Sequence, residues 1–189
     1  NNGYEFRSSI VNYLNNKNEL LRTPAIDEAC LKYIKNDKPL FPYCRYSDFK
    51  SNETIAVFGD SHAHVSFPGI ADQAGKNGKN VVLLANSGCL PLLGMPAGDS
   101  EVSKKDCESR IEQLFNILKS KKDIKKVFIF TRGTAYVTNT EPLTGNKKLG
   151  SNATISFADF GFGLQSTINE LSLNGKQVFY VTENPELSY

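Results

Sequence analysis

The amino-acid sequence predicts an α/β protein built on a parallel β-sheet. Four short runs of β-branched, aliphatic and aromatic residues are apolar without a break, which is typical of strands that helices cover on both faces. Amphipathic stretches separate the later runs, and alternating strands and helices with right-handed crossovers give a parallel sheet. The 189 residues are enough for one domain of ordinary size. We therefore expect a single domain over 1–189, with a lead-in at 1–51 and an α/β core at 52–189.

The expected elements follow in chain order. Apolar residues at helical spacing predict a helix over 4–16, and the prolines and cysteines of 23–51 predict an irregular, disulfide-stapled lead-in. Strands are expected at 54–58, 80–85, 126–131 and 177–182, and helices at 107–121 and 160–173. Pro68 predicts that the regular part of the helix after the first strand begins late, near Phe67. The Thr-, Asn-, Gly- and Ser-rich residues 138–156 predict an exposed insertion.

Charge and hydropathy exclude two classes of protein. Lys and Arg total 22 against 20 for Asp and Glu, a formal net charge of +2. The basic residues are scattered except for lysines at 121, 122, 125 and 126, which we expect at the solvated end of a helix. A nucleic-acid-binding protein has a denser basic stripe, so no nucleic-acid partner is expected. No run approaches the roughly 20 apolar residues of a membrane-spanning helix.

Four cysteines allow three disulfide connectivities if all are paired. The pairs Cys30–Cys44 and Cys89–Cys107 are favoured because each closes a short loop through polar, turn-rich sequence. Closing a loop of about 15 residues stabilises a fold by roughly 3 kcal/mol in the loop-entropy description. The alternative is four buried thiols in a cytosolic protein. No CxxC pair and no Cys/His cluster is present in the sequence, so no metal site is expected.

The tetrapeptide Gly59-Asp60-Ser61-His62 follows the first expected strand directly. A glycine before two small polar residues allows a sharp turn, and the next helix then begins with its positive dipole end beside the Ser61 hydroxyl. Ligands of open α/β sheets bind beyond the carboxyl ends of the strands. Ser61 is therefore a candidate nucleophile. The alternative is that Ser61 only caps the helix, since serine is favoured at that position.

Polar residues also follow the second and third strands. Asn86 and Gly88 come after the second, and the N–H groups of Ser61 and Gly88 are expected to form an oxyanion hole. Thr131 and Arg132 end the third strand at the same edge. The alternatives are that Gly88 serves only a turn and that Arg132 is an ion-paired surface residue.

These motifs resemble those of the SGNH (GDSL-like) hydrolases. The tetrapeptide GDSH, the segment NSGCLP at 86–91, the four cysteines and ENPEL at 183–187 are similar to SGNH domains fused behind acyltransferase-3 membrane domains in bacterial surface-polysaccharide O-acetyltransferases. The resemblance implies a three-layer α/β/α, flavodoxin-like fold, here without its C-terminal strand and helix. It implies Ser61 as nucleophile and Gly88 as oxyanion donor. Asp60, His62, Asn86 and Arg132 are the residues expected to line the site.

Two features depart from the family pattern. The third block reads Thr131-Arg132-Gly133-Thr134 instead of a GxND-like motif, and no DxxH follows to supply the general base and its orienting Asp. The two histidines, His62 and His64, are expected to hydrogen-bond locally at the start of the helix. We expect the base in a later segment, so that the chain as given is a nearly inactive N-terminal portion of an SGNH domain.

The resemblance implies O-acyl transfer, usually of acetyl, to a sugar hydroxyl of a surface polysaccharide such as the lipopolysaccharide O-antigen. The acyl group would come through an acyltransferase-3 domain in the same full-length chain, with no further cofactor, on the periplasmic side of the inner membrane. Paired cysteines would fit that oxidising compartment. Two alternatives remain: a carbohydrate O-acetyl esterase, and a non-catalytic glycan-binding or partner-docking module with the same fold.

Overall fold

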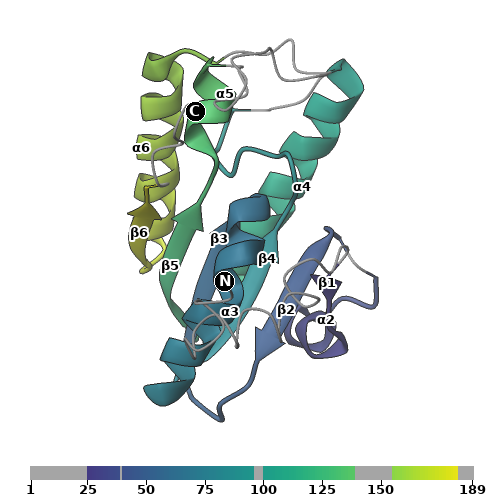
Figure 1. The fold of residues 1–189 in the computed structure, drawn as a ribbon, viewed down its shortest axis with the longest axis vertical. Helices are drawn as coiled ribbons and strands as arrows, with labels where there is room; N and C mark the ends of the chain where they lie inside the picture. Colours follow the sequence, from purple (N-terminus) through teal and green to yellow (C-terminus); the bar gives the residue numbers. More distant parts are fainter. Residues whose placement is uncertain (1–24, 39, 96–99, 139–154, 183–189) are drawn as a thin grey trace, which may run out of the picture.

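The computed structural model describes residues 25–38, 40–95, 100–138 and 155–182 (Figure 1). Their elements are β1 (Ala25–Ile26), α2 (Glu28–Ile34), β2 (Tyr43–Ser47), β3 (Thr54–Gly59), α3 (Ser61–Lys76), β4 (Asn80–Ala85), α4 (Glu101–Ser120), β5 (Ile124–Phe130), α5 (Gly133–Thr138), α6 (Phe157–Leu173) and β6 (Gln177–Val181). The helix expected at 4–16, the ENPEL segment and most of the insertion at 138–156 lie outside the described residues. Among the described helices, none combines the length and apolar character needed to cross a membrane.

The strands form one sheet in the order β1-β2-β4-β3-β5-β6. The four strands that the sequence predicted are β3, β4, β5 and β6, and their pairings with one another are all parallel. Their order, β4-β3-β5-β6, is that of the first four strands of a flavodoxin-like sheet. The predicted α/β class is therefore confirmed. From β3 the chain first forms β4 on one side of β3 and later forms β5 on its other side. The topological switch point therefore lies between β3 and β5.

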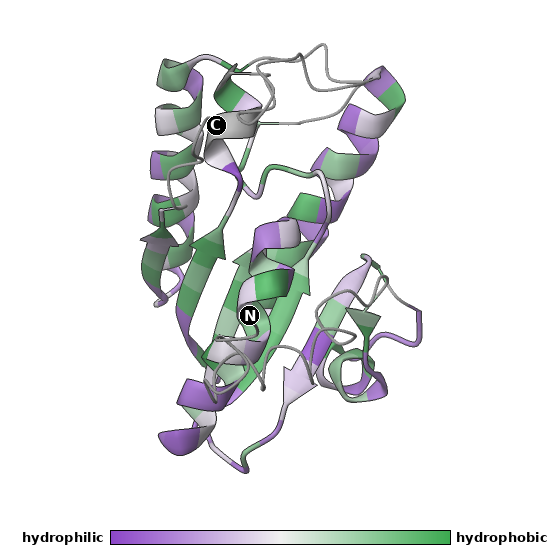
Figure 2. Cartoon of the chain, viewed as in Figure 1, coloured by the Kyte–Doolittle hydropathy of each residue, from purple (hydrophilic) through white to green (hydrophobic). Residues whose placement is uncertain are grey.

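Helices cover both faces of the sheet. Alternate strand residues point to opposite faces, so Val57 of β3 packs with α3 whereas its neighbours Ala56 and Phe58 pack with α4. Figure 1 shows α3 in front of the strands, and α2, α4 and α6 contribute to the core on the opposite face. In Figure 2 the strands β3, β4, β5 and β6 are mainly hydrophobic, and all six residues of β4 are buried. This explains why the strand sequences are apolar without alternation.

The lead-in is more regular than the sequence predicted. The part of residues 23–51 that the structure describes contains β1, α2 and β2, and β2 pairs antiparallel with β4. The sheet is therefore mixed. Only the first two residues of β2, Tyr43 and Cys44, are buried. A strand that is mostly not buried does not need a continuous apolar run, and β2 has none. The Cys30–Cys44 disulfide joins α2 to β2, with 5.6 Å between Cα atoms, and this predicted pair is confirmed.

The starts of three helices differ from the prediction, and the smallest difference is in α6, which begins at Phe157 and not at 160. α3 begins at Ser61 and not near Phe67, with Pro68 inside it. Proline removes the N–H that would reach the carbonyl of His64 and crowds that carbonyl, but the helix continues through it to Lys76. α4 begins at Glu101, well before Cys107, because a capping box of Ser100 and Ser103 starts it. Its polar first turns carry no apolar stripe, so the hydrophobic pattern missed them.

A cluster of polar contacts lies at the amino ends of β3 and β5. Tyr33 Oη and Thr54 Oγ1 each donate a hydrogen bond of 2.7 Å to Asp123 Oδ2. The Lys121 ammonium lies 4.4 Å from the centre of the Tyr33 ring and donates to the Tyr33 carbonyl. Lys121 and Lys122 directly follow α4, whereas Lys125 and Lys126 belong to β5, so only two of the four lysines lie at the expected helix end. These contacts attach α2 to the core.

Candidate active site

The predicted site residues begin where β3 ends, at Gly59. Gly59 pairs with Phe130 of β5 and Ala85 of β4, so it lies between the carboxyl ends of two neighbours. A Cβ atom on Gly59 would lie 1.9 Å from the Phe130 carbonyl oxygen. Only glycine allows the two strands to approach this closely. The chain then turns through Asp60 into α3 at the switch point.

Asp60 connects α3 to the end of β5. Its side chain is almost fully buried, with the residue 1% exposed. Oδ1 accepts a hydrogen bond of 2.8 Å from the N–H of His62. Oδ2 accepts bonds of 3.0 Å from Thr131 Oγ1 and 2.8 Å from the Arg132 N–H. Asp60 is therefore the N-cap of α3, and the alternative that Ser61 caps the helix is wrong: Ser61 is its first residue.

Tyr136 of α5 lies beside the Asp60 carboxylate. It is 8% exposed. Burial raises the pKa of its hydroxyl far above the ordinary value, and the negative charge and hydrogen bond of Asp60 raise this pKa further. The nearby Arg132 lowers the same pKa by a smaller amount. The phenol of Tyr136 therefore stays protonated at an alkaline pH at which an ordinary tyrosine ionises.

The two histidines have different surroundings. His62 Nδ1 lies 3.3 Å from Asp60 Oδ1, and about a third of the His62 side chain is exposed (36%). His64 is buried and stacks on Tyr43 of β2, with 4.3 Å between ring centroids and 8° between ring planes. His62 therefore lies beside Asp60, whereas His64 packs between α3 and the sheet.

The segment after β4 is attached to β3 through Asn86. Its N–H donates to the Gly59 carbonyl at 2.9 Å, and its side-chain amide donates to Cys89 Sγ at 2.8 Å. Gly88 has a φ of +71°, in the left-handed region where glycine is favoured. The segment therefore needs glycine at this position for its backbone alone, whatever Gly88 does for a ligand.

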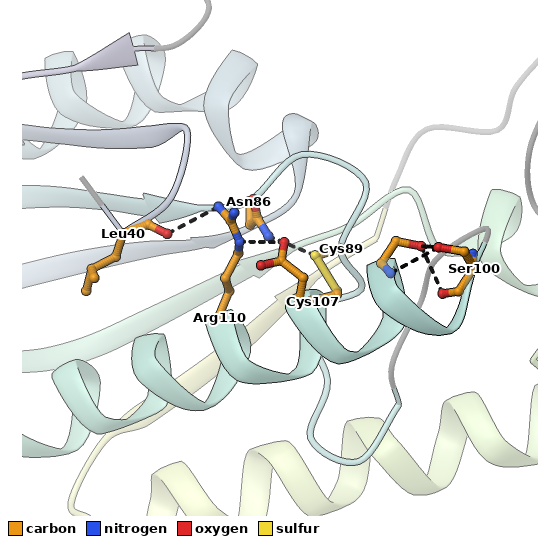
Figure 3. Close-up of a disulfide and its surroundings, with 8 residues drawn as sticks. Leu40, Asn86, Cys89, Ser100, Cys107 and Arg110 are labelled. Atoms are coloured by element: carbon orange, nitrogen blue, oxygen red, sulfur yellow. Dashed lines mark hydrogen bonds and ion pairs between the residues drawn. A yellow bond between two sulfur atoms is a disulfide. The ribbon is translucent and has the colours of Figure 1, made fainter. Parts of the chain in front are cut away.

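A disulfide and a small apolar cluster hold the same segment on two sides. Cys89 is bonded to Cys107 of α4, with 5.5 Å between Cα atoms, which confirms the second predicted pair (Figure 3). Leu90 and Leu92 pack with Tyr136 and with the first turns of α6. The Leu93 N–H donates to Thr167 Oγ1 of α6 at 2.9 Å. The loop that carries Gly88 is thus fixed to α4, α5 and α6.

Comparison with known proteins identifies the family. A sequence profile described as "SGNH domain (fused to AT3 domains)" matches residues 29–189. The chain belongs to this family. A solved structure, the periplasmic domain of the lipopolysaccharide acetyltransferase of Salmonella ser. Paratyphi A, is similar with a TM-score of 0.52 at 13% sequence identity. The match covers 94% of this chain and 59% of that one, so this chain spans about three fifths of that structure's length. No curated protein matches the chain.

The SGNH domain places the six predicted site residues after the carboxyl ends of three neighbouring strands, β3, β4 and β5. Asp60, Ser61 and His62 are consecutive, and the backbone of Arg132 is bonded to Asp60. Asn86 is one hydrogen bond from Gly59, and Gly88 follows it closely. The sequence argument did not assign Thr131 and Tyr136 as partners of Asp60. A threonine at the end of an otherwise apolar strand was the available signal.

Proposed function

We propose that this SGNH domain transfers an acyl group, acetyl in the simplest case, to a sugar hydroxyl through an ester on Ser61. The observation that carries the proposal is the location of Ser61. It is the first residue of α3, at the switch point of the sheet, directly after a buried carboxylate that ties the helix to β5. A helix N-terminus favours developing negative charge, which is what acyl transfer produces.

The chemistry has two half-reactions. In the first, Ser61 Oγ attacks the acyl carbonyl of the donor, its proton goes to a base, and the donor's leaving group departs with a proton. The N–H groups of Ser61 and Gly88 are the proposed donors to the tetrahedral oxyanion, each worth about 3 kcal/mol. In the second, a sugar hydroxyl oxygen attacks the same carbonyl and gives up its proton, and Ser61 leaves as a hydroxyl again. No electrons are transferred to or from a cofactor.

The base is assigned by family resemblance alone. The family uses a histidine of a DxxH motif, which the 189 residues do not contain. His62 is the histidine beside Ser61, but its Nδ1 lies next to Asp60 Oδ1, and a neighbour on the same turn is poorly directed to take the Ser61 proton. We therefore propose that these residues alone retain only the slow reaction that an incomplete triad supports.

Location and partners follow from the disulfides and the family. Two disulfides fit an oxidising compartment, and we propose the periplasmic side of the inner membrane. The family description names fusion to AT3 domains, so the acyl donor is proposed to arrive through such a membrane domain. A surface polysaccharide or lipopolysaccharide is the proposed acceptor, since the similar solved domain is a lipopolysaccharide acetyltransferase.

The test is Ser61→Ala in the full-length protein, with O-acetylation of the surface polysaccharide as the readout. We expect acetylation to fall by about 10³-fold or more, because the acyl-enzyme can no longer form. Ser66→Ala, a change in the same helix, is the matched control and is expected to retain activity. Unchanged acetylation in Ser61→Ala would reject the nucleophile. Release of acetate without transfer would indicate an esterase, and a folded protein whose Ser61 resists a fluorophosphonate would indicate a binding module.

A further inference from the structure

We propose that Asp60 is a positioning residue for the reaction: it fixes the backbone of Ser61 against the end of β5. The inference rests on the proposed function, since it concerns the geometry of the proposed nucleophile. Asp60 itself is not assigned contact with the substrate. Its two carboxylate oxygens are bonded to two different elements, which a helix cap alone does not require.

The two oxygens divide the contacts between the elements. Oδ1 accepts from the His62 N–H in the first turn of α3 at 2.8 Å. Oδ2 accepts from Thr131 Oγ1 at 3.0 Å and from the Arg132 N–H at 2.8 Å, both just after β5. A cap needs only the first of these bonds. The second pair joins the start of the helix to a strand whose sequence position is about 70 residues away.

The backbone on both sides of Ser61 is therefore held. The Asp60 N–H donates to the Phe130 carbonyl at 3.3 Å, and the Asp60 carbonyl accepts from Ala63 at 3.1 Å. With His62 bonded to Oδ1, the peptide groups before and after Ser61 have fixed directions. These groups include the Ser61 N–H, which is the proposed oxyanion donor. Its direction relative to Arg132 is set through Asp60.

The environment makes the bonds to Asp60 strong and specific. The residue is 1% exposed, so water does not compete for its oxygens. Hydrogen bonds to an ionised carboxylate are shorter and stronger than neutral ones, and they strengthen in a low-dielectric site. Loss of the β5 contacts would leave buried donors without their acceptor and let the two elements shift relative to each other.

Asp60→Asn separates the capping of α3 from the bonds to Thr131 and Arg132. Asparagine is as good an N-cap as aspartate, so Oδ1 can still accept from His62. Its Nδ2 group, however, would face the donors of Thr131 and Arg132. In the full-length protein we expect Asp60→Asn to fold and to label at Ser61 with a fluorophosphonate about 10- to 100-fold more slowly, the cost of misplacing a reacting group by about 1 Å.

Asp123→Asn is the matched control. Asp123 also accepts two side-chain hydrogen bonds, one from Tyr33 of α2 and one from Thr54 of β3, but at the opposite end of the strands. It is expected to lower thermal stability and leave the labelling rate of the folded protein unchanged. An Asp60→Asn protein that labels at the wild-type rate, or an equal slowing in both variants, would reject the inference.

Thr131 supplies a second, milder pair of variants. Thr131→Val removes one donor to Oδ2, and Thr131→Ser restores a hydroxyl. We expect slower labelling in the valine variant and recovery in the serine variant. If Asp60→Asn fails to fold, this pair decides the question, and equal rates in both would reject the inference. Absence of labelling in the wild-type protein would instead reject the proposed function.

Discussion

Asp60 and Asp123 connect the same two strands at opposite ends. At the carboxyl ends, Asp60 follows β3 and accepts from Thr131, which follows β5. At the amino ends, Asp123 precedes β5 and accepts from Thr54, the first residue of β3. Each carboxylate also has a tyrosine neighbour, Tyr136 in one case and Tyr33 in the other. The hydrogen-bonding groups are nearly the same, but their surroundings differ.

The difference lies in what each carboxylate holds in place. Asp60 is buried and precedes Ser61, at the edge where the loops of parallel strands gather. Asp123 is partly exposed and attaches α2 through Tyr33. Burial acts to raise the pKa of Asp123, but hydrogen bonds from Thr54 and Tyr33 outweigh it and lower this pKa below its ordinary value. We infer that the contacts of Asp60 support the proposed reaction at the carboxyl edge of the sheet, whereas the similar contacts of Asp123 support stability at the amino edge.

The largest effect is expected from Gly59→Ala, which breaks the carboxyl edge. The added methyl would meet the Phe130 carbonyl at 1.9 Å, so β3 and β5 must separate. We expect a loss of about 3 kcal/mol in the free energy of unfolding, or no folding at all. Gly69→Ala is the control, because nothing lies within 4 Å of its Cβ in α3. That variant should gain about 0.5–1 kcal/mol in urea denaturation.

Removal of either disulfide should lower the free energy of unfolding by about 3 kcal/mol, as loop closure predicts. Cys30→Ala/Cys44→Ala loosens α2 and hence the Asp123 side. Cys89→Ala/Cys107→Ala frees the loop that carries Gly88. Both pairs should lower the melting temperature, but only the second should slow fluorophosphonate labelling of the folded full-length protein. Equal labelling in the two variants would contradict a role of the second disulfide in holding the site.

Asp123→Asn should cost about 1 kcal/mol at neutral pH, since a partly exposed acceptor of two hydrogen bonds is weakened. The pH dependence has a definite sign. The pKa of Asp123 is lower in the folded protein than its ordinary 3.8, so the stabilisation is complete above about pH 5 and is lost as pH falls through the folded value. The stability difference between wild type and variant should therefore shrink in urea titrations near pH 3. A difference that grows towards acid pH would contradict the assignment.

The smallest effect is expected for Lys76→Ala, at the exposed end of α3. Lys76 pairs with Asp72 one helical turn earlier, with 2.7 Å between Nζ and Oδ2 and both side chains 61% exposed. Such i,i+4 pairs contribute about 0.3–0.5 kcal/mol, and salt screens them. The loss should vanish at about 1 M NaCl, where the Debye length is roughly 3 Å. A loss that persists in salt would assign Lys76 a packing role.

The strands of the core could be predicted from the sequence, whereas the flank and the site contacts could not. β4 is buried at all six positions, so its apolar run is unambiguous. β2 is buried at only two positions, and it belongs to the sheet because it pairs with β4. Pro68 also misled the prediction, because an interior proline disturbs a helix locally without having to end it, and α3 runs through Pro68.

The candidate site shows the same limit. Ser61, Asp60 and His62 are adjacent in sequence and were found as a motif, and both disulfides were found from spacing. The contact of Thr131 with Asp60 depends on the register that pairs Gly59 with Phe130. Register between distant strands leaves no local pattern in the sequence. This is why the β5 partners of Asp60 were not predicted.

The separation of 71 residues between Asp60 and Thr131 also sets an order of events during synthesis. A chain made from its N-terminus completes β3, α3 and β4 well before β5 exists, and contacts between distant segments form late because loop closure costs entropy. During that interval Ser61 is already present but its neighbour Asp60 has no β5 donors. We therefore expect the backbone around Ser61 to reach its final geometry only after β5 has docked against β3.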